Sequence, residues 1–178
     1  MAIIDITKHT VRSSDLFFFD NNVWIYIFGP IANSNKDKQG VYSSFLRQIQ
    51  SARATIFINS LVIAEFANFC LRLGFKQWKE EHRLYDAEYK RDYIQSDHYK
   101  ESIKDTIANI KAICKTSERH PDDFNAVNFD NILNNSTIID FNDSYYSAYC
   151  VLNNLKIVTD DKDFQKISEE KLQVITQV

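Results

Sequence analysis

A run of four apolar residues that stops at an acid constrains the fold of this chain most. Leu16 to Phe19 reads Leu-Phe-Phe-Phe, which is typical of a short strand buried on both faces in the middle of a parallel sheet. Asp20 follows, and then two asparagines that favour a helix start. In open α/β sheets ligands bind beyond the carboxyl ends of the strands, so Asp20 either caps a helix or serves chemistry there.

Four more short apolar segments fit strands, and helical patterns separate most of them. The predicted strands are residues 16–20, 54–58, 137–140, 155–158 and 172–175. This alternation predicts an α/β fold with a parallel five-stranded sheet flanked by helices. Ile3, Ile4 and Ile6 fit either a short edge strand or a packed tail.

The helices are predicted from apolar spacing and from capping residues. They cover residues 23–28, 41–53, 61–73, 75–90, 98–117, 121–133 and 144–154, and residues 31–40 are predicted to be a polar loop. Only 3 Gly and 2 Pro in 178 residues favour such a helix-rich architecture. We interpret residues 1–178 as a single domain with a helical elaboration at about 75–135.

Cysteine usage and hydropathy indicate the compartment. Cys70, Cys114 and Cys150 are widely spaced within apolar patterns, so they show no metal-ligand or redox spacing. The N-terminus has no basic segment followed by an apolar core, and no apolar run approaches membrane-spanning length. We therefore expect a cytoplasmic protein that does not bind membranes.

Charge is unevenly distributed along the chain. The net charge is −3, which argues against a protein that coats nucleic acid non-specifically. Residues 71–119 carry 11 Lys and Arg against 9 acids, and residues 120–178 carry 4 against 10. A fold that brings these regions together would place positive side chains around an acidic pocket, although a solvated helical surface is the simpler interpretation of the middle third.

Four acids recur near the carboxyl ends of the predicted strands: Asp20, Glu65, Asp143 and Asp161. Glu65 lies in a strongly apolar helix, where a carboxylate is either on a narrow exposed stripe or in a site. Four like charges at one edge of a sheet raise one another's pKa or require a cation. Oxygen-rich acidic pockets suit Mg²⁺ or Mn²⁺, so this pattern predicts metal-assisted phosphodiester hydrolysis.

The segments that carry these acids resemble the four acidic motifs of the PIN-domain nucleases, which include the VapC-type toxins of bacterial toxin–antitoxin systems. These segments are Phe19-Asp20-Asn21-Asn22-Val23, the helix containing Glu65, Asp143-Ser144-Tyr145-Tyr146-Ser147-Ala148 and Thr159-Asp160-Asp161-Lys162-Asp163-Phe164. The resemblance covers about Leu16 to Leu73 and Thr137 to the C-terminus. It implies a Mg²⁺- or Mn²⁺-dependent endoribonuclease with an RNA substrate, and an antitoxin or a second copy of the chain as a candidate protein partner.

The resemblance also implies roles for individual residues. Asp20, Glu65, Asp143 and Asp161 would ligate metal and position the attacking water, while Asn22 and Thr159 would steady the pocket by hydrogen bonds. Asp160 fits either a ligand or a surface residue, and we favour Asp161 as the ligand because its Thr-x-Asp spacing matches the motif. The chain departs from the compact toxins in three features: Asn21 in place of a small hydroxyl residue, the segment before the first strand and the long helical middle.

Two other classes of protein stay open from the sequence. One is a non-catalytic PIN-like module that binds RNA or protein through its aromatic helical middle. The other is an Asp-dependent phosphatase, which would need a second acid two residues after Asp20, where Asn22 stands.

Four basic residues follow the Glu65 helix at helical spacing: Arg72, Lys76, Lys79 and Arg83. They are candidates for contacts to RNA phosphates. A solvated face balanced by Glu80 and Glu81 is the simpler interpretation of the same residues.

Overall fold

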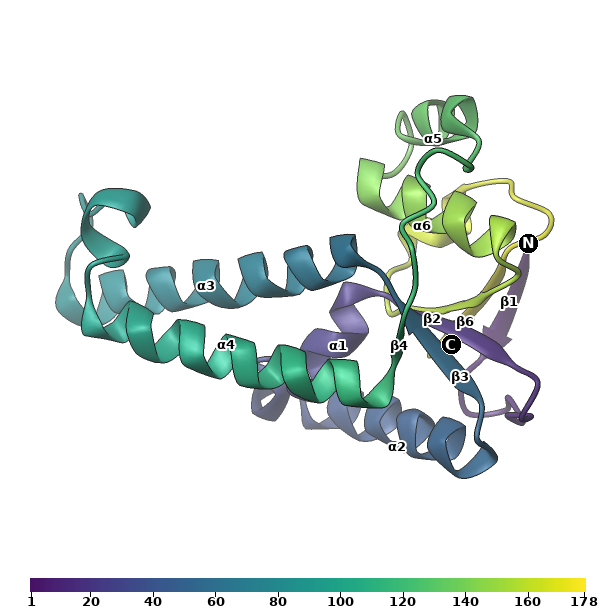
Figure 1. Ribbon diagram of the computed structural model, residues 1–178, viewed down its shortest axis with the longest axis horizontal. Helices are drawn as coiled ribbons and strands as arrows, with labels where there is room; N and C mark the ends of the chain where they lie inside the picture. Colours follow the sequence, from purple (N-terminus) through teal and green to yellow (C-terminus); the bar gives the residue numbers. More distant parts are fainter.

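Six parallel strands form the sheet, in the order β1-β6-β5-β2-β3-β4 over the described residues. The computed structural model describes residues 1–178 except the side chain of Asn33. The strands are β1 (Ala2–Asp5), β2 (Leu16–Phe19), β3 (Thr55–Ile58), β4 (Glu118–Arg119), β5 (Lys156–Val158) and β6 (Gln173–Thr176). The prediction of an α/β fold with a parallel sheet flanked by helices is confirmed, with one strand more than expected (Figure 1).

The first apolar run forms a central strand of this sheet. β2 pairs with β3 on one side and with β5 on the other. Phe17, Phe18 and Phe19 are fully buried because helices cover both faces of the strand. The carboxyl ends of β2, β3 and β5 therefore lie next to one another.

Two edge strands differ from the predicted set of five. β1 pairs with β6, so the edge-strand interpretation of the N-terminal isoleucines is correct. β4 pairs with Phe57 and Ile58 of β3 although both of its own residues are exposed. An exposed two-residue strand has no apolar pattern, and it exists only because β3 offers it backbone partners.

The strand predicted at residues 137–140 is wrong. This segment is a turn after α5 (Phe129–Asn135). The backbone N–H groups of Ile138 and Ile139 both donate to the Asn135 carbonyl. Ile139 is buried, so the apolar character that suggested a strand serves the packing of this turn.

Six α-helices account for most of the remaining described chain. They are α1 (Asn21–Phe28), α2 (Lys36–Ala52), α3 (Ser60–His82), α4 (Asp97–Thr116), α5 and α6 (Phe141–Leu152). Single turns of 3-10 helix cover Ala32–Ser34 and Asp163–Lys166, and a π-helical turn covers Tyr89–Tyr93. None of the described helices is both long and apolar enough to cross a lipid bilayer.

Three helix boundaries correct the sequence prediction. α2 begins inside the predicted loop because the Asn35 side chain caps it by accepting from the Lys38 backbone N–H at 3.3 Å. α3 is one helix of 23 residues that passes through the break expected before Phe75. The helix predicted from Pro121 forms only from Phe129 onward.

Helices α3 and α4 form an antiparallel arm that extends away from the sheet (Figure 1). Aromatic residues fill the outer half of this arm around Tyr93, whose ring lies 5.3 to 5.5 Å from those of Phe75, Trp78 and Tyr99. Gly74 of α3 faces the Tyr93 hydroxyl and Ser102 of α4 so closely that a Cβ atom there would lie 2.5 Å from the hydroxyl oxygen. The arm is built from residues 60–116, whereas the sequence predicts a helical elaboration at about 75–135.

Candidate acidic site at the carboxyl edge of the sheet

Asp20 lies at the end of β2 and is 5% exposed. It caps α1, since its Oδ1 accepts from the Asn21 backbone N–H at 2.6 Å. Its Oδ2 accepts from Asn22 Nδ2 at 2.5 Å and from the Thr159 hydroxyl at 2.7 Å. Burial raises the pKa of Asp20 to about 7, and the charges of Glu65 and Asp161 add to the effect. Asp20 is thus both a helix cap and a carboxyl group within an acidic cluster.

Asn22 and Thr159 tie the ends of β2 and β5 together. Asn22 Nδ2 also donates to the Thr159 Oγ1 at 3.0 Å, while Asn22 Oδ1 accepts from the Asp160 backbone N–H at 3.2 Å. Thr159 is fully buried, and its Oγ1 accepts from the Asp161 backbone N–H at 2.9 Å. These bonds fix the orientation of Asp20 and the path of the chain into Asp161.

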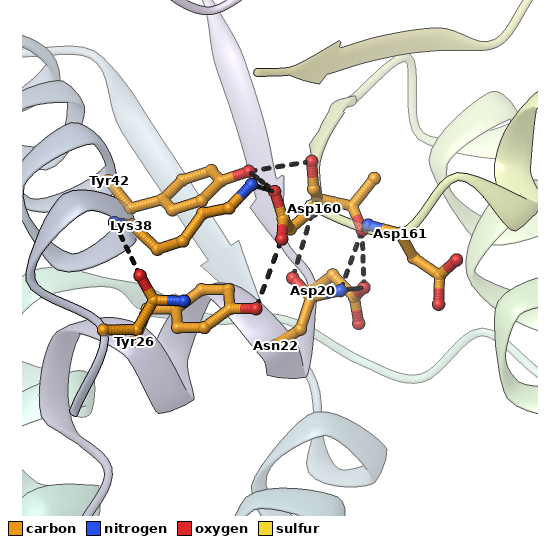
Figure 2. Close-up of polar contacts among 9 residues, drawn as sticks. Asp20, Asn22, Tyr26, Lys38, Tyr42, Asp160 and Asp161 are labelled. Carbon is orange, nitrogen blue, oxygen red and sulfur yellow. Dashed lines mark hydrogen bonds and ion pairs between the residues drawn. The ribbon is translucent and has the colours of Figure 1, made fainter. Parts of the chain in front are cut away.

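Asp160 and Asp161 point in opposite directions (Figure 2). The Asp160 carboxylate accepts from Lys38 Nζ at 2.5 Å, from the Tyr42 hydroxyl at 2.9 Å and from the Tyr26 hydroxyl at 3.2 Å. Burial and the charge of Asp160 both raise the pKa of Tyr42, so this hydroxyl stays a donor. Asp160 therefore joins β5 to α1 and α2, which leaves Asp161 as the acid turned toward the cluster.

The sequence analysis does not identify the three residues that bind the Asp160 carboxylate: Tyr26, Lys38 and Tyr42. Tyr26 and Tyr42 stack at 5.8 Å between ring centroids, and Lys38 precedes Tyr42 by one helical turn. The i to i+4 spacing was visible in the sequence. The sequence prediction places Lys38 in a loop, whereas it lies in α2.

Glu65 lies in the second turn of α3 and is partly buried. One carboxylate oxygen accepts from Asn142 Nδ2 at 2.5 Å, and the other accepts from the Tyr146 hydroxyl. Burial, with the charge of Glu65 next, raises the pKa of Tyr146 well above its usual range. These two bonds connect α3 to α6. The Glu65 carboxylate therefore does not lie on an exposed stripe of the helix, which is one of the two interpretations from the sequence.

Asp143 gives the clearest sign that the acids converge. It lies in the first turn of α6, where its backbone N–H donates to Asp140 Oδ1 at 2.9 Å, and it is 8% exposed. Burial raises the pKa of Asp143 to about 8, with further contributions from four acids: Asp20, Asp140, Asp161 and Glu65. The charges of Asp20, Asp161 and Glu65 therefore act on Asp143 at the carboxyl edge of the sheet, and so does that of the exposed cap Asp140.

The chemistry of this cluster fits a divalent cation, although its oxygens do not form a ready ligand set. In the part of the chain that the structure describes, no three Asp, Glu, His or Cys side chains are grouped at metal-binding distance. Asp20 and Glu65 instead direct their oxygens to hydroxyl and amide donors. The site offers only oxygen ligands, which hard cations such as Mg²⁺ or Mn²⁺ prefer. Without a cation its buried carboxyls keep their protons near neutral pH, and a bound cation would stabilise their ionised form.

The four basic candidates lie toward the tip of the arm. Arg72, Lys76 and Lys79 are in the same helix as Glu65, and Arg83 is its C-cap. At 1.5 Å per residue they follow Glu65 by about 10 to 27 Å, so they are not part of the acidic cluster. The Arg72 guanidinium lies 5.1 Å from the centre of the Tyr89 ring, and Lys79 Nζ lies 5.4 Å from that of Phe75. Contact with RNA phosphates stays a prediction for this part of the arm.

Fold and site together define an α/β protein with a carboxylate cluster at the carboxyl edge of a parallel sheet. The family model of the PIN domain matches residues 17–170. The chain therefore belongs to the PIN-domain family, whose members are generally nucleases that use divalent metal ions.

Two solved structures are similar to this chain at low sequence identity. One is VapBC2 from Rickettsia felis bound to a DNA fragment from its promoter, with a TM-score of 0.54 and 16% identity over 89% of this chain and 96% of that one. Another is PAE2754 from Pyrobaculum aerophilum, with a TM-score of 0.46 and 15% identity over 97% of this chain and 91% of that one. No curated protein matches the chain significantly.

Proposed function

We propose that this chain is a divalent-metal-dependent endoribonuclease that hydrolyses RNA phosphodiester bonds at Asp20, Glu65, Asp143 and Asp161. The proposal is supported by the position of these acids at the carboxyl edge of the sheet, where burial and then the charges of Asp20, Asp161 and Glu65 raise the pKa of Asp143 to about 8. Membership of the PIN family supports nuclease chemistry. Mg²⁺ or Mn²⁺ is the proposed ion because both prefer carboxylate and water oxygens and leave positions for phosphate.

A bound Mg²⁺ or Mn²⁺ would polarise the phosphoryl oxygen and help to generate hydroxide from water. The chain's own residues would supply the carboxylate ligands and hold them in position. Without a metal ion, the pKa values of Asp20 and Asp143 are raised to about 7 and about 8, so both carboxyls would release their protons when they ligate the ion. Asn22 and Thr159 hold Asp20 in a fixed orientation through hydrogen bonds of 2.5 and 2.7 Å.

We also propose that the nuclease is the toxin of a type II toxin–antitoxin system and acts in the cytoplasm with an antitoxin as its partner. Two similarities support this role: the motif resemblance to VapC-type toxins and the fold shared with VapBC2 from Rickettsia felis. A gene for a small antitoxin-like protein directly beside this one is the expected genomic arrangement. An isolated gene would count against the toxin role and leave the nuclease proposal standing.

A non-catalytic PIN-like module that binds RNA or protein is the second candidate. It is favoured by one observation, that both oxygens of Glu65 accept hydrogen bonds from Asn142 and Tyr146. An Asp-dependent phosphatase finds no such support, since Asn22 donates to Asp20 where a second acid would be needed.

Cleavage of end-labelled RNA by the purified chain tests the proposal. We expect cleavage with Mn²⁺ or Mg²⁺ and none with EDTA, and Asp143→Asn should reduce the rate by about 100-fold or more. Asp130→Asn is the matched control, because Asp130 is exposed on α5 and does not belong to the cluster. Mn²⁺ should also raise the Tm of the wild type but not of Asp143→Asn. Binding of RNA without cleavage would favour the non-catalytic module, and release of phosphate from small esters would favour the phosphatase.

A further inference from the structure

Exposed large apolar side chains are concentrated in one segment of the sequence. Eleven large apolar residues are strongly exposed among those described, and five of them fall within residues 124–141: Phe124, Phe129, Leu133, Ile138 and Phe141. Their exposed fractions range from 42% to 55%. We call these five residues the α5 patch.

Contacts along α5 make the core of this patch continuous. The rings of Phe124 and Phe129 meet edge to face at 5.6 Å between centroids. Leu133 lies one helical turn after Phe129 and shares its face, whereas Ile132 is fully buried on the inner face. A surface that leaves so many large apolar groups in water is typical of an interaction site.

The charges of the segment that carries the patch indicate the kind of partner. Residues 120–155 contain no Lys or Arg, but they contain five aspartates: Asp122, Asp123, Asp130, Asp140 and Asp143. Such a segment repels the phosphates of RNA. It also disfavours a second copy of this chain, which would bring the same acids face to face. A partner that supplies both apolar and basic side chains matches the apolar groups and the acids together.

The patch reaches the acidic cluster. Phe141 directly precedes Asn142, whose side-chain amide donates to Glu65. Phe124 lies 6.3 Å from the Tyr145 ring, and the Tyr145 ring lies 5.8 Å from that of Tyr146, which also bonds Glu65. Aromatic packing therefore connects the exposed surface to the site, and an occupant of the patch would lie beside it.

We infer that the α5 patch is a docking surface for a protein segment that presents apolar side chains flanked by Lys or Arg. The inference goes beyond the proposed function, because the surface would bind such a segment whether or not the chain cleaves RNA. Apolar contact would supply affinity, and the aspartates would exclude anionic segments.

Fluorescence anisotropy of labelled probes with the full chain in EDTA tests this inference. The main probe is an amphipathic helical peptide of Leu and Lys, about 18 residues or five turns long. Matched peptides replace Lys by Glu or Leu by Ser, and an oligouridine RNA is the fourth probe. We expect the Leu/Lys peptide to bind at least about tenfold more tightly than both matched peptides, a difference of about 1.4 kcal/mol.

Two variants locate the binding. Phe129→Ser combined with Leu133→Ser should weaken binding of the Leu/Lys peptide by about tenfold or more. Ile138→Ser, outside the helix, is an independent second variant in case the first unfolds in circular dichroism. The matched control is Leu84→Ser combined with Tyr85→Ser, because these apolar residues are exposed 41% and 69% at the tip of the arm. The control should bind as the wild type does.

Three results would overturn the inference. The first is equal peptide affinity in the wild type and both patch variants. The second is a loss of RNA affinity in the patch variants, which would assign the surface to nucleic acid. The third is a wild-type dimer in sedimentation velocity that the patch variants dissociate, which would assign it to a second copy. None of these measurements depends on cleavage, so failure of the nuclease proposal would be seen separately.

Discussion

Replacing Asp143 by asparagine should stabilise the metal-free protein at alkaline pH. In the unfolded chain this carboxyl has its ordinary pKa of 3.8, whereas in the folded chain the pKa is about 8. Between these values the folded state keeps a proton that the unfolded state releases, so stability is full below pH 3.8 and falls as the pH rises toward 8. An asparagine side chain does not ionise, so the variant escapes this loss.

The size of the effect follows from the same two values. One pKa unit corresponds to about 1.4 kcal/mol, so the interval from 3.8 to about 8 sets a ceiling of about 6 kcal/mol at pH 8.5. A buried amide that lacks hydrogen-bond partners costs about 1 to 3 kcal/mol. We therefore expect Asp143→Asn to gain at most about 3 to 5 kcal/mol of unfolding free energy at pH 8.5 and to lose about 1 to 3 kcal/mol below pH 4.

Urea unfolding of the wild type and Asp143→Asn in EDTA, at pH 4 and pH 8.5, measures this difference. Asp130→Asn serves as the exposed control and should shift neither value. Addition of Mn²⁺ at pH 8.5 should stabilise the wild type and leave the variant unchanged. A variant that is less stable than the wild type by the same amount at both pH values would refute the crowding of acids around Asp143.

Three further predictions concern other parts of the molecule. Asp20→Asn should abolish metal-dependent cleavage of labelled RNA while the far-UV circular dichroism stays native, and retained cleavage would remove Asp20 from the proposed site. Lys38→Met should cost about 1 to 2 kcal/mol in urea unfolding because the Asp160 carboxylate loses its cation, and adding Asp160→Asn should restore part of this loss; strictly additive losses would contradict the pairing. Gly74→Ala should lower the Tm by roughly 2 to 8 °C, since its Cβ would lie 2.5 Å from the hydroxyl of the fully buried Tyr93, and an unchanged Tm would show that the arm yields at this contact.

The central sheet could be predicted because its signals are local. Leu16–Phe19 is a continuous apolar run that ends at an acid, and the capping residues after β2 and β3 mark the next helices. Asp143 does not follow a strand as the sequence predicts. It lies in the first turn of a helix that Asp140 caps by accepting from the Asp143 backbone N–H.

The remaining features depend on contacts between distant residues. The Lys38 side chain binds a carboxylate 122 positions further along the chain, and no local pattern reports such a pair. The sequence predicts two helices, 61–73 and 75–90, whereas α3 is continuous there and the missing side chain of Gly74 allows α4 to approach closely. Helix propensity describes the preference of a residue in an isolated helix. At Gly74 the packing of α4 against α3 outweighs that preference.

Because α3 is continuous, a movement of the arm is transmitted along the helix to Glu65. Trp78, near the outer end of the arm, and Glu65 lie on the same uninterrupted rod, about 20 Å apart at 1.5 Å per residue. A tilt of about 5° pivoting at Trp78 would displace Glu65 by nearly 2 Å, enough to break its bonds to Asn142 and Tyr146. A molecule that binds the end of the arm and tilts α3 would therefore also move the Glu65 carboxylate.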